Sequence, residues 1–355
     1  MKKILHIIGT RPQIIKLAAI VGQENSSNSK FNHFIIDTNQ HYEETMQKNL
    51  YKDFNIDTSE ILFLNIDKLY SNNISSMVSL LIPELKKINP DLVYIYGDTA
   101  STVAGTMAAK INHLSTVHIE SGLRSQLPFQ IEETNRKIVD SLSSYLFCPT
   151  NTSIENLKSE NNLNNAFVVG DITLDIFMKT KLKKPKFEDT NFLSEDYFVA
   201  TIHRQENIYN KEKLENIIKS LKSIERVIIP MHHSLEQQLN YFNLFNDLGD
   251  NIIKTDPLVY SEMLYLVKNS KGVVTDSGGL QKDAFWLEKP TITIRPKTEW
   301  VETLKNEQNI LIDEFPTNIY EKISNINYVK FNRYNDFGNG NAVLNILNKT
   351  DEILS

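Results

Sequence analysis

The sequence has little that would place the protein in a membrane, on nucleic acid or among disulfide-rich proteins. Only one of its 355 residues is cysteine, Cys148, which excludes a disulfide framework and a cysteine-rich zinc site and favours a reducing compartment. No apolar run reaches the length of a membrane span, and the apolar segment at residues 4–8 is too short for the core of a signal peptide. The formal net charge of −6 argues against a nucleic-acid surface. The composition therefore predicts a soluble, cytoplasmic protein with neither a nucleic-acid nor a membrane partner.

The most informative stretch runs from Gly272 to Asp283 and predicts a buried strand, a glycine turn and the start of a helix. The valines at 273 and 274 suit an interior parallel strand. Ser277 is a good N-cap, and the glycines at 278 and 279 leave the first N–H groups of the helix open to an oxyanion. The pattern is typical of a phosphate site, although on this stretch alone a plain helix cap after a strand explains it about equally well.

Strands and helices alternate along the whole chain, which is typical of parallel sheets. Strands are expected at residues 3–8, 33–37, 90–96, 116–119, 146–148 and 168–171, and, after a polar connection at 179–196, at 197–202, 227–230, 252–253, 272–275 and 291–295. A chain of this length is too long for one comfortable core. The predicted fold class is α/β, with two doubly wound domains.

Charged side chains follow the expected strands at their carboxyl ends, where open α/β sheets bind their ligands. Arg11 and Lys16 follow the first strand, and the two cations together suggest an anion site. Either cation alone would be interpreted as a solvated surface charge. Asp98 and Glu120 follow two later strands, which places two carboxylates at the same edge of the sheet.

Glu132 and Arg136 lie four residues apart in a predicted helix that begins at Ile131, so they share one helical face. A pair of this kind usually contributes little at a surface. Because it follows two carboxylates at strand ends, we expect a buried role for it.

Seven motifs occur in a fixed order along the chain. They are Gly9-Thr10-Arg11-Pro12 with Lys16, Gln40-His41, Gly97-Asp98-Thr99, His118-Ile119-Glu120-Ser121-Gly122-Leu123-Arg124, Glu132-Glu133 with Asn135-Arg136, Thr201-Ile202-His203-Arg204 with Glu206-Asn207, and Thr275-Asp276-Ser277-Gly278-Gly279-Leu280-Gln281. With these motifs the chain resembles the non-hydrolysing UDP-N-acetylglucosamine 2-epimerase family over nearly its whole length. The resemblance implies two Rossmann-like domains facing a cleft, of the GT-B type. Residues 1–172 with 335–355 would form the N-terminal domain, and residues 173–334 would form the nucleotide-sugar-binding domain.

The resemblance also implies an activity, namely reversible C2 epimerisation of a UDP-2-acetamido sugar by elimination and re-addition of UDP. The enzyme would use no cofactor and no metal, would supply precursors of surface polysaccharides, and would be a homodimer. Catalytic roles would fall to Asp98, Glu120, Glu132, Arg136, Lys16 and His203, with base and acid left unassigned. UDP contacts would fall to Arg11, His203, His232, Met263, Ser277, Gly278, Gly279 and Asp283.

Several positions depart from the family pattern, and the last of those named here bears on the choice of substrate. Asp283 stands where a glutamate is common, His233 where a proline usually follows the histidine, and Trp300 where a Thr-Glu-Arg-Pro-Glu motif has arginine. The last change resembles the branch acting on modified sugars, such as UDP-2,3-diacetamido-glucuronate or a 6-deoxy UDP-2-acetamido sugar. Packing of Trp300 within its loop would explain it equally well. A GT-B glycosyltransferase and a UDP-sugar binding protein without catalysis are the alternative functions.

Overall fold

The computed structural model describes residues 1–25, 30–40, 51, 56–66, 73–127, 130–187, 191–313, 319–326, 329 and 331–355. His41 of the second motif lies outside these residues. The chain divides into two compact units, residues 1–179 with 334–355 (unit 1) and residues 180–333 (unit 2). The boundary expected after residue 172 falls inside α7 (Ile172–Lys179), and this whole helix belongs to unit 1. Within the described ranges, no helix has the length and apolar character needed to span a bilayer.

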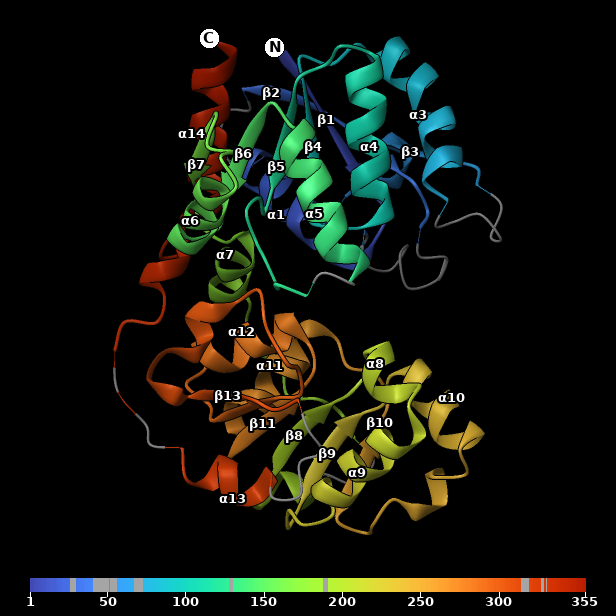
Figure 1. Cartoon of the computed structure of the whole chain (residues 1–355), viewed down its shortest axis with the longest axis vertical. Coiled ribbons are helices and arrows are strands. Elements are labelled where there is room, and N and C mark those ends of the chain that lie inside the picture. Colours follow the sequence, from blue (N-terminus) through green and yellow to red (C-terminus); the bar gives the residue numbers. More distant parts are fainter. Residues whose placement is uncertain are drawn as a thin grey trace. The chain divides into compact units, whose positions relative to one another are not determined.

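Unit 1 is built on a seven-stranded sheet with the order β3-β2-β1-β4-β5-β6-β7 and only parallel pairs (Figure 1). Its elements, besides α7, are β1 (Lys2–Ile8), α1 (Arg11–Asn25), β2 (Phe31–Asp37), β3 (Ile61–Phe63), α3 (Ile74–Ile88), β4 (Leu92–Tyr96), α4 (Ala100–Ile111), β5 (Thr116–Ile119), α5 (Ile131–Leu142), β6 (Tyr145–Cys148), α6 (Asn151–Ser159), β7 (Ala166–Val168) and α14 (Ala342–Leu354). The strand order reverses between β1 and β4, as in a Rossmann-like sheet.

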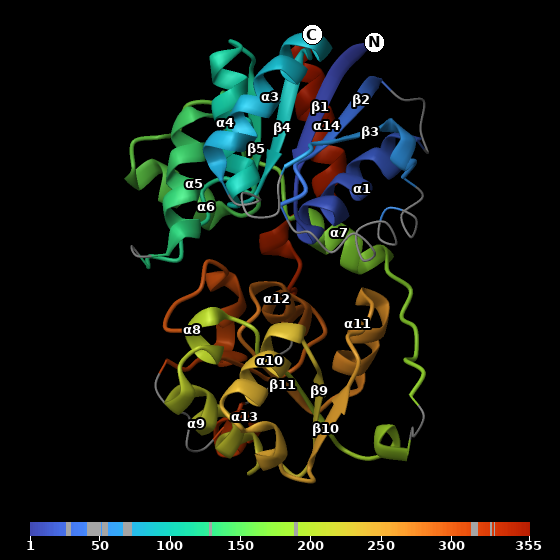
Figure 2. The ribbon, with the colours of Figure 1, turned by 90° about the vertical axis from the view of Figure 1, so that its right-hand side faces the viewer.

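Helices cover both faces of this sheet, because side chains of a strand alternate between the two faces. Ile4 and Ile8 of β1 pack into a cluster with α1 and α14, whereas Leu5 and Ile7 pack into a second cluster with α3 and α4. Figure 2 shows α3, α4 and α5 on one side of the strands and α1 and α14 on the other. Burial on both faces explains why the strands are almost continuously apolar.

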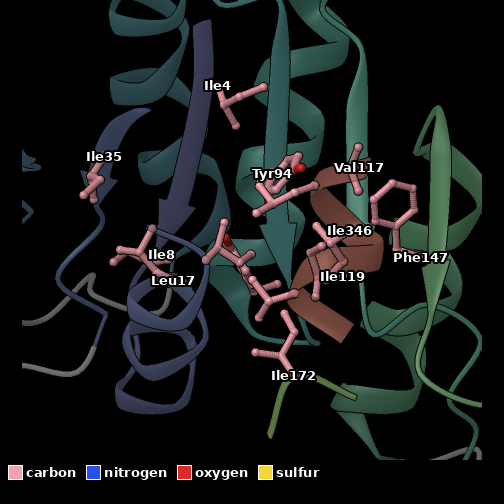
Figure 3. Packing of buried hydrophobic residues seen from close by; sticks show 14 of the residues in the cluster. Ile4, Ile8, Leu17, Ile35, Tyr94, Val117, Ile119, Phe147, Ile172 and Ile346 are labelled. Atoms are coloured by element: carbon pink, nitrogen blue, oxygen red, sulfur yellow. The ribbon is translucent and has the colours of Figure 1, made fainter. Parts of the chain in front are cut away.

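Helix α14 joins unit 1 although it lies at the far end of the sequence. The backbone N–H groups of Ala342 and Val343 donate to the Asp175 carboxylate of α7 at 3.0 and 2.9 Å, which caps the start of α14. Ile346 packs against the sheet beside Ile119 (Figure 3). The helix therefore closes one face of the sheet of unit 1.

Unit 2 is built on a six-stranded parallel sheet with the order β10-β9-β8-β11-β12-β13. Its elements are β8 (Phe198–Thr201), α8 (Gln205–Ile208), α9 (Lys211–Leu221), β9 (Val227–Pro230), α10 (His233–Tyr241), β10 (Ile252–Thr255), α11 (Tyr260–Asn269), β11 (Gly272–Thr275), α12 (Gly278–Trp286), β12 (Thr291–Thr293), β13 (Asn309–Leu311) and α13 (Ile319–Ser324). Here the order reverses between β8 and β11.

The prediction of two α/β sheets is confirmed, and most expected strands lie within two residues of their observed bounds. The strand expected at 168–171 was misplaced, since β7 spans Ala166–Val168. No strand was predicted at β3 or β13, which have only three residues each and are too short to show a hydrophobic period.

Candidate functional site

Most of the expected site residues lie at the carboxyl ends of strands. In unit 1 they follow β1, β4 and β5, with Glu132 and Arg136 on α5, and in unit 2 they follow β8, β9 and β11, with Met263 on α11. The strand order reverses between β1 and β4 and between β8 and β11, which is where open α/β sheets bind ligands. Each unit therefore has a candidate site of its own.

In unit 1, Lys16 and Glu120 form an ion pair that is almost entirely buried, with side chains 8% and 12% exposed. Lys16 lies on α1, and Glu120 directly follows β5. Glu120 has the backbone angle φ of +72°, which is unfavourable for a residue with a side chain. Its N–H group donates to the carbonyl of Phe147 at 3.1 Å, which holds this conformation in place. The structure therefore holds the carboxylate of Glu120, which lies on a strained backbone, next to the ammonium of Lys16.

The carboxylate of Asp98, directly after β4, forms an ion pair with Arg136 of α5. Its side chain is 26% exposed, whereas that of Arg136 is 8% exposed. The amide of Asn135 donates to the backbone carbonyl of Asp98 at 2.8 Å, so α5 holds this residue twice. A Cβ atom on Gly97 would lie 3.6 Å from Oε2 of Glu120, so the loops of Asp98 and Glu120 are neighbours.

The prediction that Glu132 pairs with Arg136 is wrong, because Arg136 pairs with Glu133 instead. Glu133 is the buried glutamate, and its Oε2 accepts from Arg136 at 3.3 Å and from the N–H of Ser125 at 2.8 Å. Glu132 is exposed in the first turn of α5. One residue along a helix is a rotation of about 100°, which turns Glu133 towards the sheet and Glu132 away from it.

Gln13, which was not among the predicted site residues, connects the turn after β1 to the end of β4. Its Oε1 accepts from the N–H groups of Gly9 and Thr10 at 2.8 and 3.1 Å, and its Nε2 donates to the carbonyl of Tyr96 at 2.7 Å. Arg11 is the first residue of α1, and it is exposed. The sequence alone does not show whether a glutamine at this position is buried and bonded or lies at the surface.

In unit 2, the buried carboxylate of Asp276 after β11 organises the loop after β8. It accepts from the backbone N–H groups of His203 and Arg204 at 3.0 and 2.9 Å, from Nδ2 of Asn207 at 2.9 Å, and lies 3.1 Å from Nδ1 of His203. Burial alone would raise the pKa of Asp276, but the bonds and charge of His203, together with the other donors, lower it below its ordinary value. The ring of His203, 37% exposed, is thereby fixed in orientation.

His232 lies beside His203, with ring centroids 5.6 Å apart. It occupies the N-cap of α10, where its Nδ1 accepts from the N–H of Ser234 at 3.3 Å. The loops after β8 and β9 therefore bring two imidazoles together. Met263, the other predicted contact on this side, is half-buried on α11 and packs into the core of unit 2.

The turn between β11 and α12 has the geometry of an anion site. The side chain of Ser277 accepts from the N–H of Leu280 at 3.3 Å, whereas the N–H groups of Gly278 and Gly279 point out of the helix start and have no acceptor within α12. A Cβ atom on Gly278 would lie 2.8 Å from Oε1 of Glu299, so any side chain here would have to displace the end of Glu299. Gly279 has ordinary space around it.

Further along α12, Asp283 accepts from the hydroxyl of Tyr260 at 2.7 Å. Lys282 places its ammonium 3.6 Å from the ring centroid of Trp300, a close cation–π contact. Trp300 is only 5% exposed. The position at which the family pattern has arginine therefore holds a buried indole covered by a lysine.

Within the described ranges, no group of three or more His, Cys, Asp or Glu residues is arranged to hold a metal ion. Cys148 is buried in β6, and burial raises the pKa of its thiol above the ordinary value.

A family model described as UDP-N-acetylglucosamine 2-epimerase matches residues 23–350. The chain is 38% identical to a UDP-N-acetylglucosamine 2-epimerase homolog of Methanococcus maripaludis, over 97% of this chain and 98% of that protein. It is 35% identical to the UDP-2,3-diacetamido-2,3-dideoxy-D-glucuronate 2-epimerase of Pseudomonas aeruginosa, over 87% and 88% of the two chains. The crystal structure of the UDP-GlcNAc 2-epimerase of Methanocaldococcus jannaschii in complex with UDP-GlcNAc and UDP matches with a TM-score of 0.86 and 34% identity, over 99% of each chain.

Proposed function

The chain belongs to the UDP-N-acetylglucosamine 2-epimerase family, whose members are non-hydrolysing isomerases, and we propose that it inverts C2 of a UDP-2-acetamido sugar. The reaction has two halves. In the first, the bond from C1 to the diphosphate oxygen breaks and C2 loses its proton, which leaves UDP and a 2-acetamidoglucal. In the second, a proton adds to the opposite face of C2 and the diphosphate oxygen returns to C1.

The observation that carries the proposal is the pair of carboxylates on neighbouring loops of unit 1, each with its own cation. A proton that leaves one face of C2 and returns to the other needs two acid/base groups. Asp98 with Arg136 and Glu120 with Lys16 meet this need, and Glu132 is the third candidate. Arg136 and Lys16 hold their carboxylates in place, and the assignment of base and acid is left open.

UDP binding falls, in this proposal, to the turn before α12 and to the histidines of unit 2. The N–H groups of Gly278 and Gly279 and the hydroxyl of Ser277 would bind the diphosphate as it leaves C1, when negative charge develops on it. His203, oriented by Asp276, would donate to the same oxygens, with His232 beside it and Arg11 of unit 1 as a further cation. Asp283 would accept from the ribose hydroxyls.

We further propose that the best substrate is a modified UDP-2-acetamido sugar. The support is the replacement of arginine by Trp300 and the 35% identity to the epimerase from Pseudomonas aeruginosa, whose name gives a diacetamido glucuronate. The unmodified sugar is the competing candidate, because the chain is 38% and 36% identical to two proteins from Methanococcus maripaludis, a UDP-N-acetylglucosamine 2-epimerase homolog and a UDP-N-acetylglucosamine 2-epimerase. Comparison of kcat/KM for UDP-N-acetylglucosamine and for deoxy, diacetamido and uronate derivatives decides between them.

A cytoplasmic homodimer that feeds surface polysaccharide synthesis completes the proposal. Exposed apolar side chains on α4 and α5, namely Met107, Ile111, Ile138 and Leu142, support a contact between two copies of unit 1. Sedimentation equilibrium at micromolar concentration would show twice the chain mass if this is correct.

The test of the activity is incubation with each UDP-sugar in deuterated water without an acceptor. Deuterium at C2 of both epimers is the expected result. No deuterium with any of these sugars, together with transfer of sugar to an added acceptor, would instead identify a glycosyltransferase.

A further inference from the structure

His118 belongs to none of the roles described above, yet it joins the two carboxylate loops of unit 1. It lies on β5, two residues before Glu120, with a fully buried side chain. One ring nitrogen contacts the loop of Asp98, and the other contacts a group that holds the loop of Glu120. On the basis of the proposed function, we propose that His118 is a positioning residue that sets these two carboxylates relative to each other by donating from both ring nitrogens.

The contact to the Asp98 loop runs from Nε2 of His118 to the backbone carbonyl of Gly97, at 2.8 Å. A carbonyl oxygen can only accept, so Nε2 carries a proton. Gly97 directly precedes Asp98 and has φ of +64°, a conformation that glycine adopts without strain. Its own N–H donates to the carbonyl of Ile119 at 3.1 Å. The turn that carries Asp98 is therefore fixed from β5 on both sides.

The contact to the Glu120 loop runs from Nδ1 of His118 to Oδ1 of Asp140 on α5, at 2.6 Å. The other oxygen of Asp140 accepts from the N–H of Gly122 at 3.1 Å and lies 2.8 Å from Nη1 of Arg124. Burial by itself raises the pKa of Asp140, but the charges and bonds of His118 and Arg124 bring it below its ordinary value. Because the N–H of Gly122 and the guanidinium of Arg124 can only donate, Asp140 accepts from them as a carboxylate, and Nδ1 of His118 donates to it.

With both contacts made, the ring of His118 donates from both nitrogens in a fully buried position. The ion pairs around it support this arrangement, because Arg124 contacts Asp140 and binds Glu160 with two parallel bonds of 2.8 and 2.6 Å. A ring with a single N–H group would lose one of the two contacts to the loops.

The contacts of His118 are needed because of the backbone conformation of the Glu120 loop. Glu120 and Gly122 both have left-handed backbone angles, with φ of +72° and +77°. A strained turn persists only where its surroundings hold it. Asp140 holds Gly122, the hydroxyl of Ser121 donates to the carbonyl of His118 at 2.7 Å, and His118 holds Asp140. Loss of His118 would release both carboxylate loops while leaving their carboxylates in the chain.

The experiment compares His118→Gln with His113→Gln, a control in the turn after α4 of the same unit. Glutamine can donate to Gly97 or to Asp140 but cannot reproduce both contacts. We expect kcat per UDP-binding site to fall on the order of a hundredfold, as misplaced catalytic groups do, with UDP affinity unchanged. His113→Gln should match wild type. A merely structural role would lower the number of UDP-binding sites and the melting temperature but leave kcat per site intact, and that result would overturn the proposal.

Two further measurements keep the inference separate from the proposed function. Nitrogen NMR of histidine-labelled wild type should show both nitrogens of His118 protonated at pH 7.5, and one unprotonated nitrogen would overturn the proposal even in an active enzyme. The amide signals of Asp98 and Glu120 should both shift in His118→Gln but not in His113→Gln. If wild type shows no C2 exchange with any sugar, the proposed function fails, and these NMR results still decide whether His118 couples the loops.

In His118→Ala, added imidazole should restore part of kcat, whereas 1-methylimidazole, which has one N–H at most, should not. Equal rescue by both compounds would contradict the requirement for two donors.

Discussion

The two units have the same topology around the point where the strand order reverses, but opposite chemistry at the strand ends. In unit 1, side chains pair with side chains, as in Lys16 with Glu120 and Asp98 with Arg136. In unit 2, the buried Asp276 is bound by the backbone N–H groups of His203 and Arg204 as well as by side chains, and the start of α12 offers further N–H groups. The difference teaches that the sheet provides the location and the loops provide the chemistry.

This contrast suggests that proton transfer and UDP binding are assigned to different groups. Paired carboxylates can exchange a proton while their cations stay in place, whereas backbone donors can bind an anion but cannot exchange protons with it. We therefore expect changes to the paired carboxylates of unit 1 to affect proton transfer, and changes to the donors of unit 2 to affect UDP binding.

The largest effect is expected for the carboxylates of unit 1. Asp98→Asn and Glu120→Gln keep the shape of the side chain and remove the proton acceptor, so kcat and C2 deuterium exchange should fall by about a hundredfold or more. UDP affinity, measured by calorimetry, should stay at the wild-type value. Early melting with normal activity per folded molecule would instead identify a structural ion pair.

Glu132→Gln and Glu133→Gln separate a catalytic from a structural glutamate on α5, because Glu132 is exposed and Glu133 is buried. If Glu132 transfers a proton, its variant should lose about a hundredfold in rate without any loss of stability. Glu133→Gln should lower the melting temperature, since it breaks the contacts to Ser125 and Arg136. A silent Glu132→Gln would remove this residue from the catalytic set.

The next effect concerns the diphosphate. His203→Ala should weaken binding of the leaving UDP by about 3 kcal/mol, or on the order of a hundredfold in kcat/KM. Arg11→Ala should have a similar effect although it lies in unit 1, which would show that the division follows residue chemistry and not the unit boundary. Wild-type kinetics in both variants would mean that neither residue faces the phosphates.

Acid should weaken unit 1 before unit 2. Burial and the neighbouring imidazole lower the pKa of His6 well below 6.5, and burial lowers that of His33. Below pH 6.5 the unfolded chain therefore binds more protons than the folded one, so the stability of unit 1 falls as the pH falls through this window. The lowered pKa of Asp276 means that its contribution to unit 2 is lost only below about 3.8.

Amide hydrogen exchange at pH 7 and pH 5 measures the local stability of both units in one sample. Amides of β1 and β2 should exchange faster at pH 5, after correction for intrinsic rates, than those of β8 and β11. The raised pKa values of Asp37 and Asp175, both caused mainly by burial, offset part of this loss. Equal loss in the two units would contradict the assignment to the buried histidines.

The smallest effect is expected at Trp300. Trp300→Arg would place two cations together and remove a cation–π contact of about 0.5 to 2 kcal/mol, so the melting temperature should fall. The double variant Trp300→Arg with Lys282→Met should regain stability, and it is the proper background for comparing kcat/KM between substrates. If Trp300→Arg alone keeps the wild-type melting temperature, the contact between Lys282 and Trp300 does not contribute to stability.

The features that the sequence could predict are those that depend on local pattern. Apolar runs placed the strands, and parallel strands end at a common edge, so residues such as Asp98 and Glu120 were expected to lie near each other. Partners depend on tertiary contacts. The choice of Glu133 over Glu132, the double contact of His118 and the stacking of Lys282 on Trp300 join residues whose spacing carries no signal.

The most direct test of the central claim measures the UDP dissociation constant and the rate of C2 deuterium incorporation for Asp98→Asn and His203→Ala. We predict that Asp98→Asn loses deuterium incorporation at unchanged UDP affinity. His203→Ala should lose UDP affinity and should incorporate deuterium only at raised substrate concentration or reduced rate. Weakened UDP binding in Asp98→Asn, or unchanged UDP binding in His203→Ala, would contradict the division of chemistry between the two sites.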